Sequence, residues 1–129
     1  IEELNEVVQT IPKLKLILDG EGPLKEELMQ KAKALNVLEH IDFVGFAYPK
    51  KYAAQCQIMI LPYLFESFGL VYIESFALKI PVIAFDAEAA NQIIENNVTG
   101  ILVPKKNSKA LAEKIIFLLK STGERTRII

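Results

Sequence analysis

Five short runs of apolar residues limit what this chain can fold into. Three of the runs are continuously apolar, which is typical of strands covered on both faces, and the first two each contain one charged residue, Lys15 or Asp42. The runs cover residues 14–18, 41–44, 58–61, 82–85 and 101–103. Between them, leucine, isoleucine and alanine recur about once per helical turn in 24–35 and 111–119. Strands alternating with helices predict an α/β fold, with a Rossmann-like parallel sheet flanked by helices.

Three further helices are expected from the local pattern. Residues 4–11 read as the last turns of a helix, and Pro49 is placed to open a short helix through Ala54. Residues 70–78 are apolar almost all round, so we expect that helix to be buried. Both ends of the chain look cut, because neither carries a cap or a polar tail.

Length and charge narrow the possible functions. The 129 residues suffice for one domain, here 1–129, and are too few for two domains that meet across a cleft. Lys and Arg number 15 against 16 Asp and Glu, so the whole chain has no electrostatic footprint for nucleic acid or an anionic membrane. The single Cys56 and the absence of an export signal favour the cytoplasm. The single His40 excludes histidine clusters, and we expect no metal.

The segment 62–77 carries the strongest chemical signal. It leads from a predicted strand, through a loop, into a helix, and Gly69 lies just before the helix. A glycine there lets a ligand approach the backbone. The amides of Phe68, Gly69, Leu70 and Val71 would face outward at the positive end of the helix dipole. This helix start is therefore the best candidate binding site for a diphosphate in the sequence.

Two acids lie on either side of this candidate site in the sequence, Glu66 before Gly69 and Glu74 after it. A carboxylate in an apolar helix needs hydrogen-bond donors, and ligand hydroxyls are good donors. The residues alone leave another interpretation open, in which Glu74 pairs with a buried lysine or a backbone amide and has no ligand role.

The spacing Glu66-x7-Glu74, with Phe68-Gly69 between the acids, resembles the signature of retaining GT-B glycosyltransferases, those called glycosyl transferases group 1 or family 4. Four other segments match in the same order, and together the matches cover nearly the whole chain. These segments are Leu16-Ile17-Leu18-Asp19-Gly20-Glu21-Gly22-Pro23, Ile41-Asp42-Phe43-Val44-Gly45, Pro81-Val82-Ile83-Ala84 and Val98-Thr99-Gly100-Ile101-Leu102-Val103-Pro104.

The resemblance implies a role for each matching residue. Glu74 would hold the ribose hydroxyls of the nucleotide, and Glu66 would contact the donor sugar at the reacting centre without acting as a covalent nucleophile. The remaining donor contacts would come from the backbone around the helix start and from two strand ends. These contacts are Ser67, Phe68, Gly69 and Leu70 for sugar and diphosphate, Gly45 and Phe46 near the base, and Gly20 and Gly22 in the loop after the first strand.

By the same resemblance, the chain is the C-terminal lobe of a GT-B enzyme and forms its donor-binding half. The reaction would transfer a hexose from a UDP or GDP sugar to an acceptor hydroxyl with retained configuration, in glycan, polysaccharide or glycolipid synthesis. No cofactor is implied. A missing N-terminal domain would bind the glycan or lipid-linked acceptor and carry any peripheral membrane association, so we expect the fragment to bind nucleotide weakly and to be inactive alone.

Several positions depart from the family pattern. Lys79 stands where a glycine commonly ends the helix, and Glu88-Ala89 with Gln92 replace a glycine pair and an acid. Lost glycines would close part of the donor pocket. Asn96-Asn97 replaces an acid-glycine turn, and asparagine tolerates the left-handed conformation that such a turn needs.

Other functions remain as alternatives. A non-catalytic α/β binding or assembly module of the same fold would explain the departures at Lys79, Glu88 and Gln92. An epimerase or phosphorylase of the same architecture is disfavoured by the match at the two acids. The Gly20-x-Gly22-Pro23 segment lacks the third glycine of a dinucleotide fingerprint, and Pro23 fits the first position of the following helix.

Overall fold

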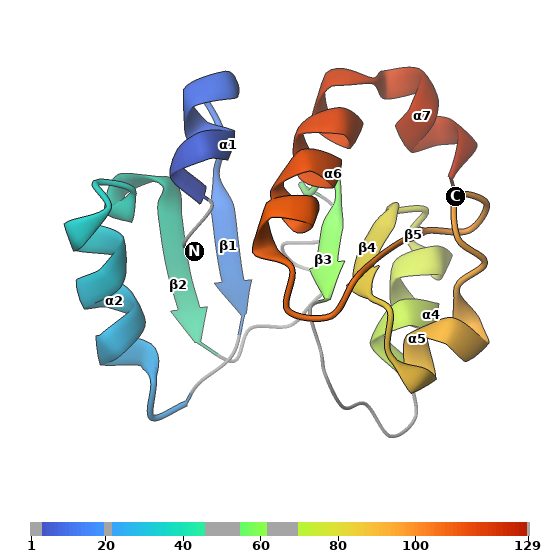
Figure 1. Cartoon of the computed structure of the whole chain (residues 1–129), viewed down its shortest axis with the longest axis horizontal. Helices are drawn as coiled ribbons and strands as arrows, with labels where there is room; N and C mark the ends of the chain where they lie inside the picture. Colours follow the sequence, from blue (N-terminus) through green and yellow to red (C-terminus); the bar gives the residue numbers. More distant parts are fainter. Residues whose placement is uncertain (1–3, 20–21, 46–54, 62–69, 129) are drawn as a thin grey trace. The chain divides into compact units, whose positions relative to one another are not determined.

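The computed structural model describes residues 4–19, 22–45, 55–61 and 70–128 (Figure 1). The chain divides into two compact units, Ile1–Tyr52 and Ala53–Ile129, and each is described by itself. The predicted helix over 49–54 lies outside the described residues. The expectation of one domain over residues 1–129 stays a prediction.

The first unit is a two-stranded parallel sheet with two helices. In chain order its elements are α1 (Leu4–Thr10), β1 (Leu16–Asp19), α2 (Lys25–Ala34), the 3-10 turn η1 (Leu38–His40) and β2 (Ile41–Gly45). β1 pairs with β2, and Leu16 lies opposite Ile41. Residues of both helices and both strands share one core, whose fully buried members include Ala32 and Val37. The apolar period of residues 24–35 thus buries Ala32 on one face of α2 and leaves Lys33 on the exposed face, although Leu24 at the start of the period is also exposed.

His40 connects the amino ends of the two strands. Its Nδ1 lies 3.0 Å from the carbonyl oxygen of Leu14, just before β1. Lys15 adds two further contacts between the strands: its ammonium donates to the carbonyl of Glu39 at 3.1 Å and lies 3.5 Å from the carboxylate of Asp42. These contacts help to set the register of β1 against β2.

The second unit is a three-stranded parallel sheet, with β4 in the middle (Figure 1). Its strands are β3 (Met59–Leu61), β4 (Val82–Phe85) and β5 (Ile101–Val103). Its helices are α4 (Leu70–Ala77), α5 (Glu88–Ile93), α6 (Ser108–Lys120) and α7 (Thr122–Arg127). The apolar runs 82–85 and 101–103 begin and end at the same residues as β4 and β5.

Alternate residues of β4 enter two different cores. Val82 and Ala84 pack with Tyr72 of α4 and with residues of α5. Ile83 packs in the other core with Leu118 of α6 and with Ile128. Because helices cover both faces, every residue of the strand must be apolar, which confirms the interpretation of this continuous apolar run.

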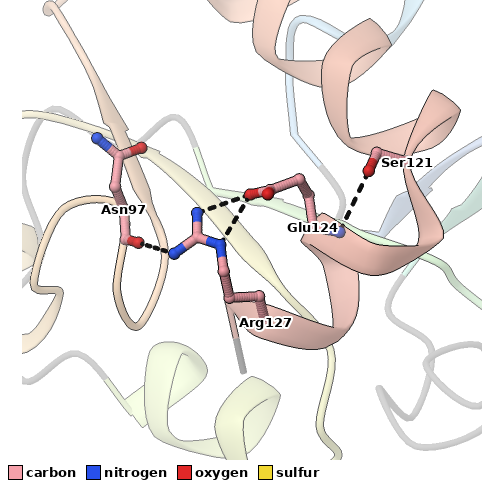
Figure 2. A network of polar contacts seen from close by, with 4 residues as sticks. All are labelled: Asn97, Ser121, Glu124 and Arg127. Carbon is pink, nitrogen blue, oxygen red and sulfur yellow. Dashed lines mark hydrogen bonds and ion pairs between the residues drawn. The ribbon is translucent and has the colours of Figure 1, made fainter.

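Helix α7 was not expected from the sequence, and polar contacts hold it in place (Figure 2). Ser121 caps its start by accepting a hydrogen bond from the amide of Glu124 at 3.2 Å. Arg127 donates from Nε and Nη2 to the Glu124 carboxylate at 2.9 and 2.6 Å, and from Nη1 to the carbonyl oxygen of Asn97 at 2.8 Å. One guanidinium therefore joins α7 to the turn before β5.

The hydrogen bonds from Arg127 hold the pKa of the Glu124 carboxyl below its usual value. Because the folded pKa is lowered, this pair contributes to stability at neutral pH and loses its contribution as the pH falls through that pKa. Both groups lie at the surface, where solvent screens the charges, so the contribution is small.

Helix α4 ends in a left-handed residue that is not glycine. Lys79 has φ of 57°, its amide donates to the carbonyl of Phe76 at 3.0 Å, and the amide of Ile80 donates to Ser75 at 3.0 Å. These two bonds form a Schellman motif, so the helix closes tightly without the glycine of the family pattern. Asn97 has φ of 64°, which confirms the expected left-handed turn at that position.

We expect Lys79→Gly to stabilise the protein by about 0.5–1 kcal/mol. A left-handed lysine is strained by roughly 1–2 kcal/mol, and part of the gain is offset by the greater freedom of glycine in the unfolded chain. Urea unfolding followed by circular dichroism measures the difference. Lys109→Gly, at an exposed position inside α6, is the control and should destabilise.

One expectation about the start of a helix needs correction. Helix α2 begins at Lys25, so Pro23 is not its first residue but lies in the turn before it. Among the residues that the structure describes, none of the helices combines the length and apolar character that crossing a bilayer requires.

Candidate functional site

The structure describes four of the predicted site residues, and they fall into both units. Leu70 and Glu74 belong to α4 of the second unit, while Gly22 and Gly45 belong to the first. The remaining predicted contacts lie outside the described residues. These are Gly20, Phe46, Glu66, Ser67, Phe68 and Gly69.

Helix α4 is buried on one side only, so the expectation of a helix buried all round was wrong. Tyr72 and Ser75 are 1% exposed, whereas Ile73 is 53% exposed and Glu74 also lies at the surface. The helix packs on a single face of the sheet, through Tyr72 and the core residues of β3, β4 and α5. The Glu74 carboxylate therefore has access to solvent or to a ligand and needs no internal donor.

Glu74 leans toward the start of its helix. It follows Leu70 by four residues, so both lie on the same side of α4, and the Cα–Cβ bond of a helical residue tilts toward the helix N-terminus. The first amides of a helix have no acceptor within it, and among the described residues these amides belong to 70–72. Thus α4 combines amide donors and a surface carboxylate within about its first turn and a half.

A buried hydroxyl fixes the opposite side of α4. Ser75 is the fully buried polar side chain of the described core, and its Oγ donates to the carbonyl of Val71 at 2.8 Å. This bond satisfies the hydroxyl within the helix, and the burial of Ser75 and of the Tyr72 ring against the core leaves α4 little freedom to rotate about its axis. The burial of Tyr72 and Ser75 thereby sets the direction in which Glu74 faces.

The carboxyl ends of β3, β4 and β5 meet at one edge of the second sheet, because the strands are parallel. The segment after β3 leads into α4, and β4 leads directly into α5, so both helices start from this edge. Ligands of open parallel sheets bind at this kind of edge. The geometry therefore agrees with a ligand site at the start of α4.

Asp86 is a further candidate ligand contact at this edge, and the sequence motifs did not indicate it. It follows β4 directly, its side chain is exposed, and its amide donates to the carbonyl of Val103 at 2.7 Å. This bond fixes the backbone at the end of the central strand. The signal for finding it was its place after an apolar run, since the residue after a central parallel strand is a common ligand contact.

The departures in the next segment lie on α5. This helix begins at Glu88, Ala89 is half-buried, and Gln92 is exposed. Ala90, which is 0% exposed, anchors the helix on the sheet. Whether Glu88 and Gln92 narrow a donor pocket stays a prediction.

Gly45 has a conformation that explains why a glycine stands there. It is buried, ends β2 and has φ of 67°, in the left-handed region that glycine adopts without strain. Its pairing with Asp19 skips Val44, which makes a bulge at the carboxyl ends of β1 and β2. The bulge redirects the chain where the first unit is expected to approach the nucleotide base.

Gly22 is not required by local packing. An added Cβ would meet no atom within 4 Å, and the residue is exposed. Its carbonyl accepts a hydrogen bond from the amide of Lys25 at 3.3 Å, which helps to start α2. A role of Gly22 in shaping a donor loop stays a prediction.

The described residues include no group of three or more His, Cys, Asp and Glu side chains that would hold a metal ion. Burial raises the pKa of the half-buried Cys56 thiol, which keeps it protonated at neutral pH. The expectation of a metal-free site without a cofactor stays a prediction.

Solved structures identify the class of this fold. TarM of Staphylococcus aureus, solved as a mutant with fondaparinux, α-GlcNAc-glycerol and UDP, matches with a TM-score of 0.91 and 26% identity over 98% of this chain and 26% of that chain. The C-terminal domain of a glycosyl transferase group 1 protein from Francisella tularensis matches with a TM-score of 0.88 and 29% identity, over 98% and 70%. The parallel sheets flanked by helices thus have the GT-B glycosyltransferase fold.

The particular family follows from the sequence comparison. The family described as "Glycosyl transferases group 1" matches residues 1–129, and this chain belongs to it. A relative from Campylobacter jejuni is named N-acetylgalactosamine-N,N'-diacetylbacillosaminyl-diphospho-undecaprenol 4-alpha-N-acetylgalactosaminyltransferase. It is 34% identical over 109 residues, which cover 83% of this chain and 30% of the relative. The chain spans about a third of the length of the curated relatives it matches.

Proposed function

We propose that the protein to which this chain belongs transfers a sugar from a nucleoside diphosphate donor to an acceptor hydroxyl. In this proposal the chain forms the donor-binding half, the sugar is a hexose, and the anomeric configuration is retained. The family match over residues 1–129 carries the proposal. The match to a TarM structure that contains UDP supports the choice of donor class.

Helix α4 is the centre of the proposed donor site. Its first amides would bind the diphosphate, and the carboxylate of Glu74 would accept hydrogen bonds from ribose hydroxyls. The exposure of Glu74 and its place one turn from the helix start support this role. Glu66 would contact the donor sugar, and Asp86 is a further candidate for a hydroxyl contact.

The protein would contribute mainly position and electrostatics to the reaction. Amide donors at a helix start stabilise the charge that develops on a departing diphosphate. Holding the donor by its ribose and phosphates places the anomeric carbon for attack by the acceptor hydroxyl. In this proposal the leaving phosphate helps to take the acceptor proton, and no residue of this chain becomes covalently attached to the sugar.

The acceptor would be a glycan or lipid-linked molecule bound by a domain outside this chain, in the cytoplasm. The name of the Campylobacter jejuni relative, which contains an undecaprenol-linked acceptor, supports this class.

Incubation of the full-length protein with UDP and GDP sugars tests the proposal. Calorimetry should detect binding of one nucleoside diphosphate at micromolar to millimolar concentration, a range typical of enzyme substrates. Proton NMR of the product should show a transferred sugar with the same anomeric configuration as the donor. Free epimer or sugar phosphate as the product would instead favour another enzyme of this architecture.

The absence of binding by every nucleotide at about millimolar concentration would contradict the proposal and favour a non-catalytic module. The departures at Lys79, Glu88 and Gln92 motivate that second candidate. Lys79 no longer supports the non-catalytic candidate, because α4 ends in a tight left-handed turn without a glycine.

A further inference from the structure

The segment that leads from β5 into α6 brings three lysines to the carboxyl edge of the second sheet, the edge at which its parallel strands end. β5 ends at Val103 and α6 begins at Ser108, so residues 104–107 lie at this edge (Figure 1). Lys109 follows in the first turn of α6. We call Lys105, Lys106 and Lys109 the edge lysines.

A tight turn fixes the backbone of the first two edge lysines. The amide of Asn107 donates to the carbonyl oxygen of Pro104 at 3.2 Å, so Lys105 and Lys106 are the two central residues of the turn. The Asn107 side chain in turn accepts a hydrogen bond from the amide of Ala110 at 2.9 Å, which starts α6 directly after the turn. The backbone of both lysines therefore has a defined place at the end of β5.

The charges of the edge lysines are not neutralised by neighbouring acids. All three side chains are exposed, and none has an ion pair or a side-chain hydrogen bond within the described part of the chain. The arginines further along the chain differ, because Arg127 pairs with Glu124 and Arg125 donates to the carbonyls of Leu118 and Leu119 at 2.7 and 2.8 Å. The edge lysines are thus available to attract an anion.

Three acids occupy the neighbouring part of the same edge. Asp86 follows β4 directly, Glu88 begins α5, and Glu74 lies one turn into α4. Their formal charge of −3 would repel a diphosphate at the start of α4. The edge lysines carry a formal charge of +3, so the six residues together are neutral. An anionic ligand can therefore approach an edge that would otherwise be acidic.

The edge lysines lie close enough to α4 to act on such a ligand through their electric field. Neighbouring parallel strands are about 4.8 Å apart and β4 lies between β3 and β5, so the end of β5 is about 10 Å from the end of β3. Charges are screened over about 30 Å in 0.01 M salt and about 8 Å in 0.15 M salt. At this separation the attraction is therefore substantial in dilute salt and weak in concentrated salt.

We propose that the edge lysines attract the diphosphate of the sugar donor toward the start of α4. The inference rests on the proposed function, since it takes a nucleoside diphosphate as the ligand. Positive charge beside a binding site raises the local concentration of an anionic ligand and its rate of association. The edge lysines need no contact with the bound donor for this effect, and they offset the repulsion from the carboxylate of Glu74.

Calorimetric titration of the full-length protein with UDP and with GDP, in dilute and in concentrated salt, tests the inference. Lys105→Gln with Lys106→Gln removes two charges about 10 Å from a doubly charged diphosphate. The Kd of the nucleotide should rise about fivefold in 0.01 M salt and less than about twofold in 0.5 M salt.

The matched control is Lys79→Gln with Lys120→Gln, which removes the same charge from two exposed lysines of the same unit. Lys79 follows the end of α4 and Lys120 ends α6, so both lie at the opposite edge of the sheet. The 13 residues of α6 span about 20 Å, which places Lys120 far from the carboxyl edge. The control pair should change Kd less than about twofold in either salt.

Two further pairs separate charge from a structural role of the turn. Lys105→Arg with Lys106→Arg keeps the charge and should bind the nucleotide as the unmodified protein does. Lys105→Glu with Lys106→Glu doubles the change in charge and should raise Kd about 25-fold in 0.01 M salt.

Equal changes in the edge pair and the control pair, a loss that salt does not diminish, or a loss in the arginine pair would overturn this inference alone and leave the proposed function intact. If the unmodified protein bound neither UDP nor GDP, the proposed function and this inference would both be overturned.

Discussion

Glu74→Ala in the full-length protein is expected to lower kcat/KM for sugar transfer about a hundredfold. The proposed carboxylate accepts hydrogen bonds from two ribose hydroxyls, and the net contribution of a hydrogen bond to a charged group is about 1.5–3 kcal/mol. Loss of two such bonds at the lower figure, about 3 kcal/mol, corresponds to roughly a hundredfold. Because the ribose is held in the ground state as well as in the transition state, most of the loss should appear as a raised KM. Initial rates at varied donor concentration measure the effect.

Glu113→Ala is the matched control for this prediction. It removes another exposed helical glutamate of the same unit, on α6, and should change kcat/KM less than about twofold. Unfolding of both variants should be close to that of the unmodified protein, because both carboxylates are exposed. Full activity of Glu74→Ala would remove this residue from the donor site.

Gly100→Ala is expected to destabilise the protein by about 1–3 kcal/mol. Gly100 is buried before β5, and an added Cβ would lie 2.9 Å from Cγ2 of Ile94 and 3.1 Å from the carbonyl oxygen of Val82. Ile94 is itself buried and Val82 belongs to the central strand, so neither can retreat without disturbing the core. Chemical unfolding monitored by circular dichroism measures the loss.

Gly123→Ala is expected to stabilise the protein, in contrast to Gly100→Ala. A Cβ at Gly123 would meet no atom within 4 Å, and the residue lies inside α7. Alanine is favoured over glycine in a helix by about 0.5–1 kcal/mol, so this variant should gain stability. If both variants lost similar stability, the close packing inferred at Gly100 would not be the cause.

The strands of the second sheet could be predicted because burial on both faces leaves a simple pattern. Val82, Ile83 and Ala84 are each fully buried, so apolar continuity alone marks the strand. Left-handed turns were also predictable where asparagine stands, as at Asn97. The left-handed Lys79 was not, because nothing about a lysine indicates that conformation.

The rotation of α4 could not be predicted from its composition. Its apolar residues lie almost all round the helix, yet only Tyr72 and its neighbours on one side reach the core, and Ile73 remains exposed. Periodicity identifies a buried face only when polar residues mark the other one. The surface position of Glu74 therefore came from the structure, while its spacing from Glu66 came from the sequence.

Helix α7 escaped sequence analysis because its stability comes from contacts outside it. Its residues include Gly123 and two threonines, which are poor helix formers. The cap at Ser121 and the hydrogen bond from Arg127 to the carbonyl of Asn97 compensate for that weakness. Contacts between residues 30 positions apart leave no local signal, and tertiary packing here decides the conformation.

The burial of Ile128 bears on how the second unit is assembled during translation. This side chain is 0% exposed and shares a core with Ile83 and Ile101. On the ribosome, that apolar face of the sheet stays incompletely covered until residue 128 has emerged, long after β4 has left the exit tunnel. Nascent chains in this interval are prone to aggregation, so chaperones that bind apolar segments have their greatest opportunity on this sheet late in synthesis.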